Sequence, residues 1–172
     1  MKIVGEILSQ LVMACSVSGL PADLVEAIVM TESSGYVYAL SGSYDYSDYF
    51  LLPAIQSEAD YAMSVGQASL EHNVNVSVGL MQINSWHIDK MGASIATVID
   101  PCNNVLIGTS ILREIIDRVC PSTLNNDCIN AALRQYNTGK TKETAAGNAY
   151  VAKVRSRMAQ IAQSQPVLYG SR

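Results

Sequence analysis

Apolar residues recur along most of this chain with the spacing of helices. After Pro21, one stripe collects on a single helical face: Leu24, Val25, Ile28, Val29 and Glu32. Proline suits the first turn of a helix, so this pattern predicts a helix that begins directly after Pro21. Glu32 continues the stripe as a carboxylate, and Ser33-Ser34-Gly35 is expected to end the helix.

An amphipathic helix is also predicted at the start of the chain. Its apolar stripe consists of Val4, Leu8, Leu11 and Cys15. The alternative is a short export signal that ends in a lipid-attachment cysteine. Glu6 and Gln10 interrupt the apolar core that such a signal needs. We therefore expect a first core helix, and no export signal within this chain.

Four more helices are expected further along. The first covers 57–72 with Ser57 as its N-cap, and the second begins at Asp100-Pro101, runs to Val119 and is expected to be central. A short helix covers about 129–134, and a last one follows it. The apolar stripes of the second and the last are Ile107, Ile111, Ile115 and Val119, and Tyr150, Val154, Met158 and Ile161.

Length and composition indicate one folded domain. The 172 residues are 49% apolar and 15% charged, which suffices for a sizeable core and argues against disorder. We assign 1–163 to the domain and 164–172 to a C-terminal tail, and no apolar stretch is long enough for a transmembrane segment. A net charge of −4 disfavours a nucleic-acid partner. Lys153, Arg155 and Arg157 form one basic run, which we interpret as a solvated helical face.

Four cysteines are predicted to form two disulfides. Cys15, Cys102, Cys120 and Cys128 fit no zinc-binding pattern, and we expect neither a metal nor another cofactor. Of the three possible pairings, the short interval favours Cys120 with Cys128, which leaves Cys15 for Cys102. The alternative is four reduced cysteines in the core. Disulfides would indicate an oxidising compartment, either a periplasm or the extracellular space.

Glu32 has the expected environment of an acid catalyst. Burial disfavours a charged carboxylate, and the negative end of the helix dipole disfavours it further, so both raise the pKa of Glu32. A raised pKa suits a general acid that works near neutral pH. The alternative is that Glu32 lies at the rim of the apolar stripe and reaches solvent.

The segment 35–53 differs from the predicted helices. It crowds five tyrosines among Ser, Gly and Asp: Tyr36, Tyr38, Tyr44, Tyr46 and Tyr49. Such a segment can form a short hairpin or an irregular lobe, and tyrosine rings offer faces on which sugars stack. The alternative is a tyrosine-rich loop that packs on the core.

Four motifs in one order resemble the soluble lytic transglycosylase family. They are Glu32-Ser33, Gly79-Leu80-Met81-Gln82, Tyr136-Asn137-Thr138-Gly139 and Tyr150-Val151-Ala152-Lys153-Val154. The stretches 53–72 and 100–104 resemble in particular the peptidoglycan-cleaving components of type IV secretion and conjugation systems. The resemblance covers about 3–163. It implies a mainly α, α+β lysozyme-like fold, in which a helical domain and a small β-like lobe flank a substrate cleft.

The resemblance also implies a role for each matching residue. Glu32 would protonate the glycosidic oxygen between N-acetylmuramic acid and N-acetylglucosamine, then act as base toward the muramoyl 6-hydroxyl. A 1,6-anhydromuramoyl end would result. Ser77 and Tyr150 would support Glu32, Tyr150 through a hydrogen bond. The residues implied to bind the glycan are Gly79, Leu80, Met81, Gln82, Asn84, Tyr136 and Asn137.

Two details of these motifs carry their own expectations. Gly79 is expected to let the backbone approach a sugar closely, and Met81 to offer it a flat apolar contact. The chain departs from the family pattern where Ser34 and Gly35 lengthen the usual E-S-G by one residue, which is expected to shift the helix exit without displacing Glu32.

Three functions follow from these observations. The favoured one is an exported or periplasmic enzyme that opens peptidoglycan for a secretion, conjugation or pilus apparatus, with the glycan strands and components of that apparatus as partners. The second is a lysozyme-type hydrolase, in which Asp45 or Asp48 provides the second carboxylate. The third is a wall-binding scaffold that keeps the cleft without turnover.

Overall fold

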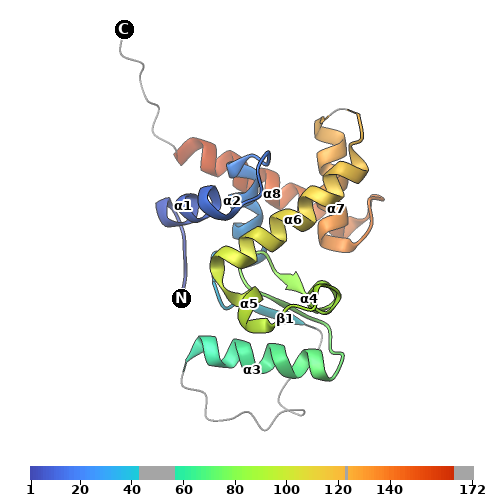
Figure 1. The fold of residues 1–172 in the computed structure, drawn as a ribbon. Coiled ribbons are helices and arrows are strands. Elements are labelled where there is room, and N and C mark those ends of the chain that lie inside the picture. Colours follow the sequence, from blue (N-terminus) through green and yellow to red (C-terminus); the bar gives the residue numbers. More distant parts are fainter. Residues whose placement is uncertain (43–56, 123, 165–172) are drawn as a thin grey trace.

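The computed structural model describes residues 1–42, 57–122 and 124–164 (Figure 1). Within these ranges the chain forms eight helices and three short strands. The helices are α1 (Glu6–Cys15), α2 (Ala22–Glu32), α3 (Glu58–Glu71), α4 (Ser85–Met91), α5 (Ile95–Ile99), α6 (Pro101–Val119), α7 (Asn126–Thr138) and α8 (Ala145–Ser164). The strands are β1 (Leu40–Gly42), β2 (Val76–Val78) and β3 (Ile83–Asn84). The predicted fold class, mainly helical with a small β lobe, is confirmed.

The helices gather into two parts, as Figure 1 shows. In the larger part α2 packs against α8, and α6 packs against both α1 and α7. In the smaller part α3 contacts α4 and α5 beside the three-stranded sheet. Helix α6 extends from the smaller part through the larger one, so its predicted central place is confirmed.

Local capping explains where several helices begin. The Ser57 hydroxyl accepts a hydrogen bond from the backbone N–H of Asp60, and the Asp100 carboxylate accepts one from the N–H of Asn103. Pro101 then occupies the first turn of α6. Both starts were predicted, because a cap depends only on residues within one turn.

Other helix predictions need correction. Helix α1 begins at Glu6, so Val4 precedes it and is exposed, while Val12 joins the core. Helix α7 is longer than predicted, because Asn125 caps its start well before Ile129. Helices α4 and α5 were not predicted, since both are too short to show a periodic stripe.

The buried face of α6 is not the predicted one. Of the isoleucine and valine stripe, only Ile115 is buried. The face that meets the core instead consists of Asn104, Val105, Gly108, Thr109, Leu112, Ile115 and Ile116. Asn104 and Gly108 on this face pack against the turn Gly79–Gln82 between β2 and β3, and the Thr109 hydroxyl accepts a hydrogen bond from the N–H of Val17.

The sheet joins the two sides of that turn. Strand β2 lies between β1 and β3 and pairs antiparallel with both, so that Ser77 is opposite Ser41 on one side and Asn84 on the other. The β lobe was expected within 35–53, where only β1 is found among the described residues. The other two strands come from the Gly-Leu-Met-Gln region, and 43–56 lie outside the described residues.

Two disulfides are present, with the pairing that the spacing favours. Cys15 at the end of α1 is bonded to Cys102 in the first turn of α6, and Cys120 to Cys128 across the connection between α6 and α7. The first bond closes a long loop, with a sequence separation of 87, and the second a short one, with a separation of 8. These two bonds account for all four cysteines of the chain, so the alternative of reduced core cysteines is wrong.

Removal of the two disulfides should destabilise the protein unequally. Loop-closure entropy predicts a loss of about 4 to 5 kcal/mol for Cys15→Ala with Cys102→Ala, and about 2 to 3 kcal/mol for Cys120→Ala with Cys128→Ala. Urea unfolding of both double variants beside the oxidised wild type measures these losses. A larger loss from the short loop would contradict the chain-entropy explanation.

Candidate active site

The site is built where α2 ends. Glu32 is the last residue of α2, and Ser34 and Gly35 both follow in the left-handed backbone region, with φ of 53° and 81°. A side chain at Gly35 would lie 2.2 Å from the carbonyl oxygen of Ile3, so glycine is required there. The two left-handed residues accommodate the extra residue of this motif and turn the chain away, which leaves Glu32 at the mouth of a pocket.

Helix α8 brings a tyrosine to this carboxylate. The hydroxyl of Tyr150 donates a hydrogen bond to Oε1 of Glu32 over 2.6 Å, across 118 positions of sequence. Tyr150 is only 6% exposed, so solvent competes little for this bond. The hydrogen bond that the motif comparison implied is therefore present.

Burial and the Tyr150 hydrogen bond shift the pKa of Glu32 in opposite directions. Burial raises the pKa of the Glu32 carboxyl above its ordinary value, and the Tyr150 hydrogen bond lowers it in part because it favours the charged form. Burial is the larger effect, so the predicted direction is confirmed. The residue lines the pocket instead of being sealed in the core, which gives a proton on this carboxyl access to a bound ligand.

A second buried tyrosine, Tyr136, interacts electrostatically with Glu32. The hydroxyl of Tyr136, near the end of α7, donates a hydrogen bond to the backbone carbonyl of Met81 over 2.9 Å. Burial, and next the charge of Glu32, hold the pKa of Tyr136 well above its usual value. Tyr136 therefore remains neutral and joins α7 to the Gly79–Gln82 turn near Glu32. Its neighbour Asn137 is exposed and is absent from the described lining of the pocket.

The Gly79–Gln82 turn is held by a buried asparagine that the sequence did not single out. Asn104 accepts from the N–H of Met81 at 2.8 Å and donates to the carbonyls of Val78 at 3.1 Å and Val98 at 2.8 Å. Gly79 has a φ of +82°, and a Cβ there would lie 2.1 Å from the Asn104 amide nitrogen. Contact with Asn104 is therefore sufficient to require glycine here, and the expected close approach of a sugar to this backbone stays a prediction.

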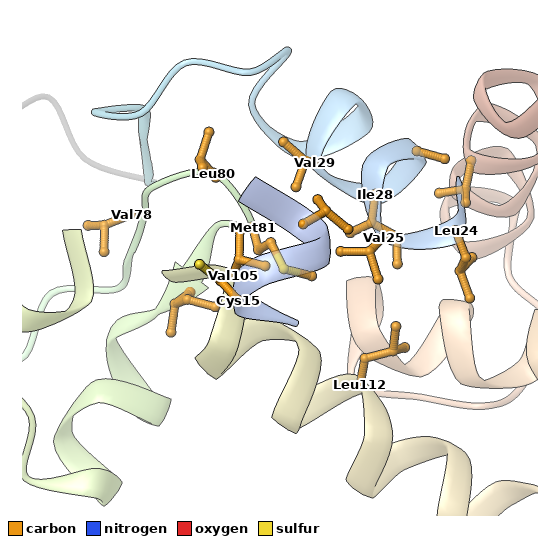
Figure 2. Close-up of a cluster of buried hydrophobic side chains, with 14 of the residues drawn as sticks. Cys15, Leu24, Val25, Ile28, Val29, Val78, Leu80, Met81, Val105 and Leu112 are labelled. Carbon is orange, nitrogen blue, oxygen red and sulfur yellow. The ribbon is translucent and has the colours of Figure 1, made fainter. Parts of the chain in front are cut away.

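The side chains of Leu80 and Met81 lie in the core. Both are fully buried, and Figure 2 shows them among core residues such as Val29 and Val105. Met81 packs so closely on α6 that a Cβ at Gly108 would lie 2.6 Å from its sulfur. The structure therefore does not bring the predicted flat contact of Met81 to the pocket; of this turn, Gln82 is the residue in the pocket's described lining.

Gln82 connects this wall to strand β1. Its φ is 50°, and its amide nitrogen donates to the carbonyls of Ala39 at 3.2 Å and Gly79 at 3.0 Å. Its amide oxygen accepts from the hydroxyl of Ser41 at 2.5 Å. Gln82 lines the same pocket as Glu32, as the sequence predicted.

Ser77 and Asn84 lie apart from this pocket's described lining. They face each other on β2 and β3, where the Asn84 amide donates to the Ser77 hydroxyl over 3.4 Å. The oxygen of the Asn84 side chain accepts from the N–H of Trp86 and caps α4. The structure assigns Asn84 a capping contact, and it lines a separate hollow beside Trp86.

The pocket itself is open and rich in hydroxyl groups and aromatic rings. Its volume is about 750 Å³, and its described lining consists of Glu32, Ser33, Ser34, Tyr36, Tyr38, Ala39, Leu40, Ser41, Ser57, Glu58, Tyr61 and Gln82. Tyr36 is 50% exposed and Tyr61 39% exposed, so each presents ring surface to a ligand.

Some predicted lining residues cannot be placed, and others were missed. Tyr44, Tyr46 and Tyr49, together with Asp45 and Asp48, lie outside the described residues. Glu58 and Tyr61 were not predicted, because they belong to the first turn of α3 and no local pattern indicates that this turn faces Glu32. In the part of the chain that the structure describes, no acidic, histidine and cysteine side chains cluster as metal ligands. None of the described helices has the length and apolarity required to cross a bilayer.

Comparison with known proteins agrees with this arrangement. The model of the transglycosylase SLT domain family matches residues 12–158. The chain belongs to this family. The match begins within α1 and ends within α8, so it includes Glu32, the Gly79–Gln82 turn and Tyr150 of this SLT domain.

Two groups of relatives are similar over part of their length. The type IV secretion system protein VirB1 of Brucella abortus is 29% identical over 101 residues, which are 55% of this chain and 42% of that protein. The invasion protein IagB of Salmonella typhimurium is 38% identical over 73 residues, which are 36% of this chain and 46% of that protein. The chain thus spans less than half the length of these relatives, and no solved structure matches it significantly.

Gly79→Ala should destabilise the SLT domain more than Gly139→Ala. Both glycines have positive φ, but a Cβ at Gly139 has no atom within 4 Å, whereas one at Gly79 overlaps Asn104. The difference between the two variants isolates this overlap, which we expect to cost about 1 to 3 kcal/mol. Urea unfolding measures the free energy of unfolding of both variants. Equal losses of stability would show that the Asn104 side chain moves aside without an energetic penalty.

Tyr150→Phe should raise the pKa of Glu32 further. The substitution removes the hydrogen bond that favours the carboxylate and leaves the burial that opposes it. An NMR titration of the ¹³C-labelled Glu32 carboxyl measures the shift without any substrate. Tyr136→Phe is the matched control, because its hydroxyl bonds to Met81 instead, and should move this pKa less. An unchanged pKa of Glu32 in Tyr150→Phe would contradict the conclusion that the Tyr150 hydrogen bond stabilises the Glu32 carboxylate.

Proposed function

We propose that this chain is a peptidoglycan lytic transglycosylase, which cleaves the β-1,4 bond between N-acetylmuramic acid and N-acetylglucosamine. The observation that carries the proposal is the Glu32–Tyr150 pair at the pocket of an SLT domain. Burial raises the pKa of the Glu32 carboxyl above its ordinary value, which is the direction that a general acid requires. Its neighbour Tyr150 orients it through one short hydrogen bond.

The reaction needs one carboxyl group that acts twice. Glu32 first donates its proton to the glycosidic oxygen as the bond from that oxygen to C1 of the muramoyl sugar breaks. The Glu32 carboxylate then removes the proton of the muramoyl 6-hydroxyl, whose oxygen bonds to C1. The products are a free N-acetylglucosamine 4-hydroxyl and a 1,6-anhydromuramoyl end, and Glu32 is protonated again. No water is consumed.

Tyr150 favours both halves of this cycle. Its hydrogen bond stabilises the carboxylate that exists between the two steps, while burial restores the proton at the end. The two effects hold the pKa of Glu32 between that of a solvated carboxylate and that of a fully buried one. A group that must give and then take a proton works best in this range.

The pocket also suits a sugar polymer. Tyr36 and Tyr61 present exposed ring surface for stacking, and Ser41 and Gln82 offer polar groups for sugar hydroxyls. An open cleft, rather than a closed cavity, admits a strand that continues on both sides of the cleaved bond.

A hydrolase is the second candidate, and one observation favours it. Glu58 is a second carboxylate among the described residues that line the pocket, in addition to Asp45 and Asp48 of the sequence. A hydrolase of the lysozyme type needs such a second carboxylate as nucleophile or to activate water. The two reactions differ in their products by one water.

We further propose that the enzyme is exported or periplasmic and opens the cell wall for a transport apparatus. The two disulfides are typical of an oxidising compartment. The names of the relatives, a type IV secretion system protein and an invasion protein, support a role beside a secretion apparatus. Components of that apparatus would be its protein partners.

Mass spectrometry of digested peptidoglycan tests the reaction. Wild type should release muropeptides lighter by one water than hydrolysis products, and Glu32→Gln should reduce the rate by at least about a hundredfold, because it keeps shape but cannot transfer the proton. Asp45→Asn, Asp48→Asn and Glu58→Gln should stay active and release the same anhydro products.

Two other outcomes would assign a different function. Hydrolytic products, together with inactivity of one of the three second-carboxylate variants, would establish the hydrolase. Binding of peptidoglycan by a folded wild type without any product would establish the scaffold.

A further inference from the structure

A basic groove adjoins the pocket on the other side of Ser34. It has a volume of about 590 Å³ and is lined by Met30, Thr31, Ser34, Ala152, Lys153, Ser156, Arg157 and Gln160. Ser34 lines both this groove and the pocket that contains Glu32. The pocket and the groove between α2 and α8 therefore border each other at Ser34.

The groove collects two of the three residues of the basic run. Lys153 and Arg157 are separated by one helical turn on α8 and line the groove together. Arg155 between them faces elsewhere, because its guanidinium donates to the Asn130 side chain at 3.0 and 2.8 Å. The three basic residues therefore do not form one uniform solvated face. Arg155 is hydrogen-bonded to Asn130, whereas Lys153 and Arg157 line the groove.

This pair is available for an anion. Among the described residues, neither Lys153 nor Arg157 is within ion-pair distance of a carboxylate, and none of the described groove residues is acidic. The side chain of Arg157 donates a hydrogen bond to the neutral Gln160 at 3.3 Å. The chain as a whole carries a net charge of −4, so this cationic pair is opposite in sign to the rest of the protein.

Position along α8 relates the pair to the reaction. Lys153 lies three residues after Tyr150, about one helical turn from the residue that hydrogen-bonds Glu32. The pair thus lies on the helix that also carries the hydrogen-bond partner of Glu32, beside a groove that shares Ser34 with the pocket. Arginine and lysine in such a groove select carboxylates or phosphates.

We propose that Lys153 and Arg157 form a subsite for the peptide stem of the substrate. The inference rests on the proposed function, because the muramoyl sugars of peptidoglycan carry a peptide on their lactyl group, and that peptide bears free carboxylates. A muramoyl unit beyond the cleaved bond, on the Ser34 side, would extend its stem into the groove. The two cations would bind the carboxylates there, so the enzyme prefers glycan strands that retain their stems.

The test compares three forms of the same glycan strands: with intact stems, with stems removed by an amidase, and with stems whose carboxylates are amidated. Wild type should cleave the intact form with a kcat/KM roughly tenfold higher than either other form, which is the magnitude of two exposed ion pairs. The double variant Lys153→Gln, Arg157→Gln should lose this preference and keep wild-type kcat/KM on stem-free strands.

A matched double variant controls for net charge. Lys140→Gln with Lys142→Gln removes the same two charges from exposed positions that line a different groove, and should keep the full preference. Activity on stem-free strands shows that each variant is folded, so a loss confined to intact stems is specific to the subsite.

The outcomes separate this inference from the function on which it rests. If wild type cleaves none of the three forms, the proposed transglycosylase function is overturned and the subsite with it. If wild type cleaves all forms equally, or the Lys153, Arg157 variant loses activity equally on all of them, the subsite alone is overturned. Equal cleavage of amidated and intact stems would likewise overturn the role of the carboxylates.

Discussion

Packing of α8 on α2 is the contact on which the rest of the site depends. It covers the apolar face of α2 and the Tyr150 and Val154 positions of α8, and it sets the Tyr150 hydroxyl 2.6 Å from the Glu32 carboxylate. The same contact supplies the burial that raises the pKa of Glu32 and the hydrogen bond that limits the rise. A small shift of α8 along α2 would alter both effects together, so the acid strength of Glu32 is coupled to helix packing.

The opposite wall depends on a buried polar group in place of apolar packing. Asn104 accepts from the N–H of Met81 in the turn and donates to the carbonyls of Val78 in β2 and Val98 in α5, so its side chain joins three segments inside the core. Loss of one partner from such a group leaves a buried donor or acceptor unpaired, which costs about 1 to 3 kcal/mol. Tyr136 adds a bond from α7 to the same turn. These bonds fix the backbone directly before Gln82, the residue of the turn that lines the pocket.

Much of the helical structure could be predicted because its causes are local. Several helix signals act within one or two turns of chain and can therefore be recognised in the sequence alone. They are the apolar stripe before Glu32, the N-caps Ser57 and Asp100, and Pro101. The stripe on α6 shows the limit of such patterns, because Ile107, Ile111 and Val119 pack against the core but lie at the edge of the fully buried face. Spacing shows that a face exists, but which face is buried depends on the turn that packs against it, through Gly108 and Asn104.

The sequence by itself determined most of the longer helices, the candidate acid Glu32 and the order of the motifs that mark the family. Only the tertiary structure decided that Met81 belongs to the core, that Asn104 holds the turn, and that Tyr61 and Glu58 line the pocket. The physical reason is distance along the chain. Each of these facts is a contact between elements remote in sequence, and such contacts are set by how helices pack rather than by the residues on either side of a position.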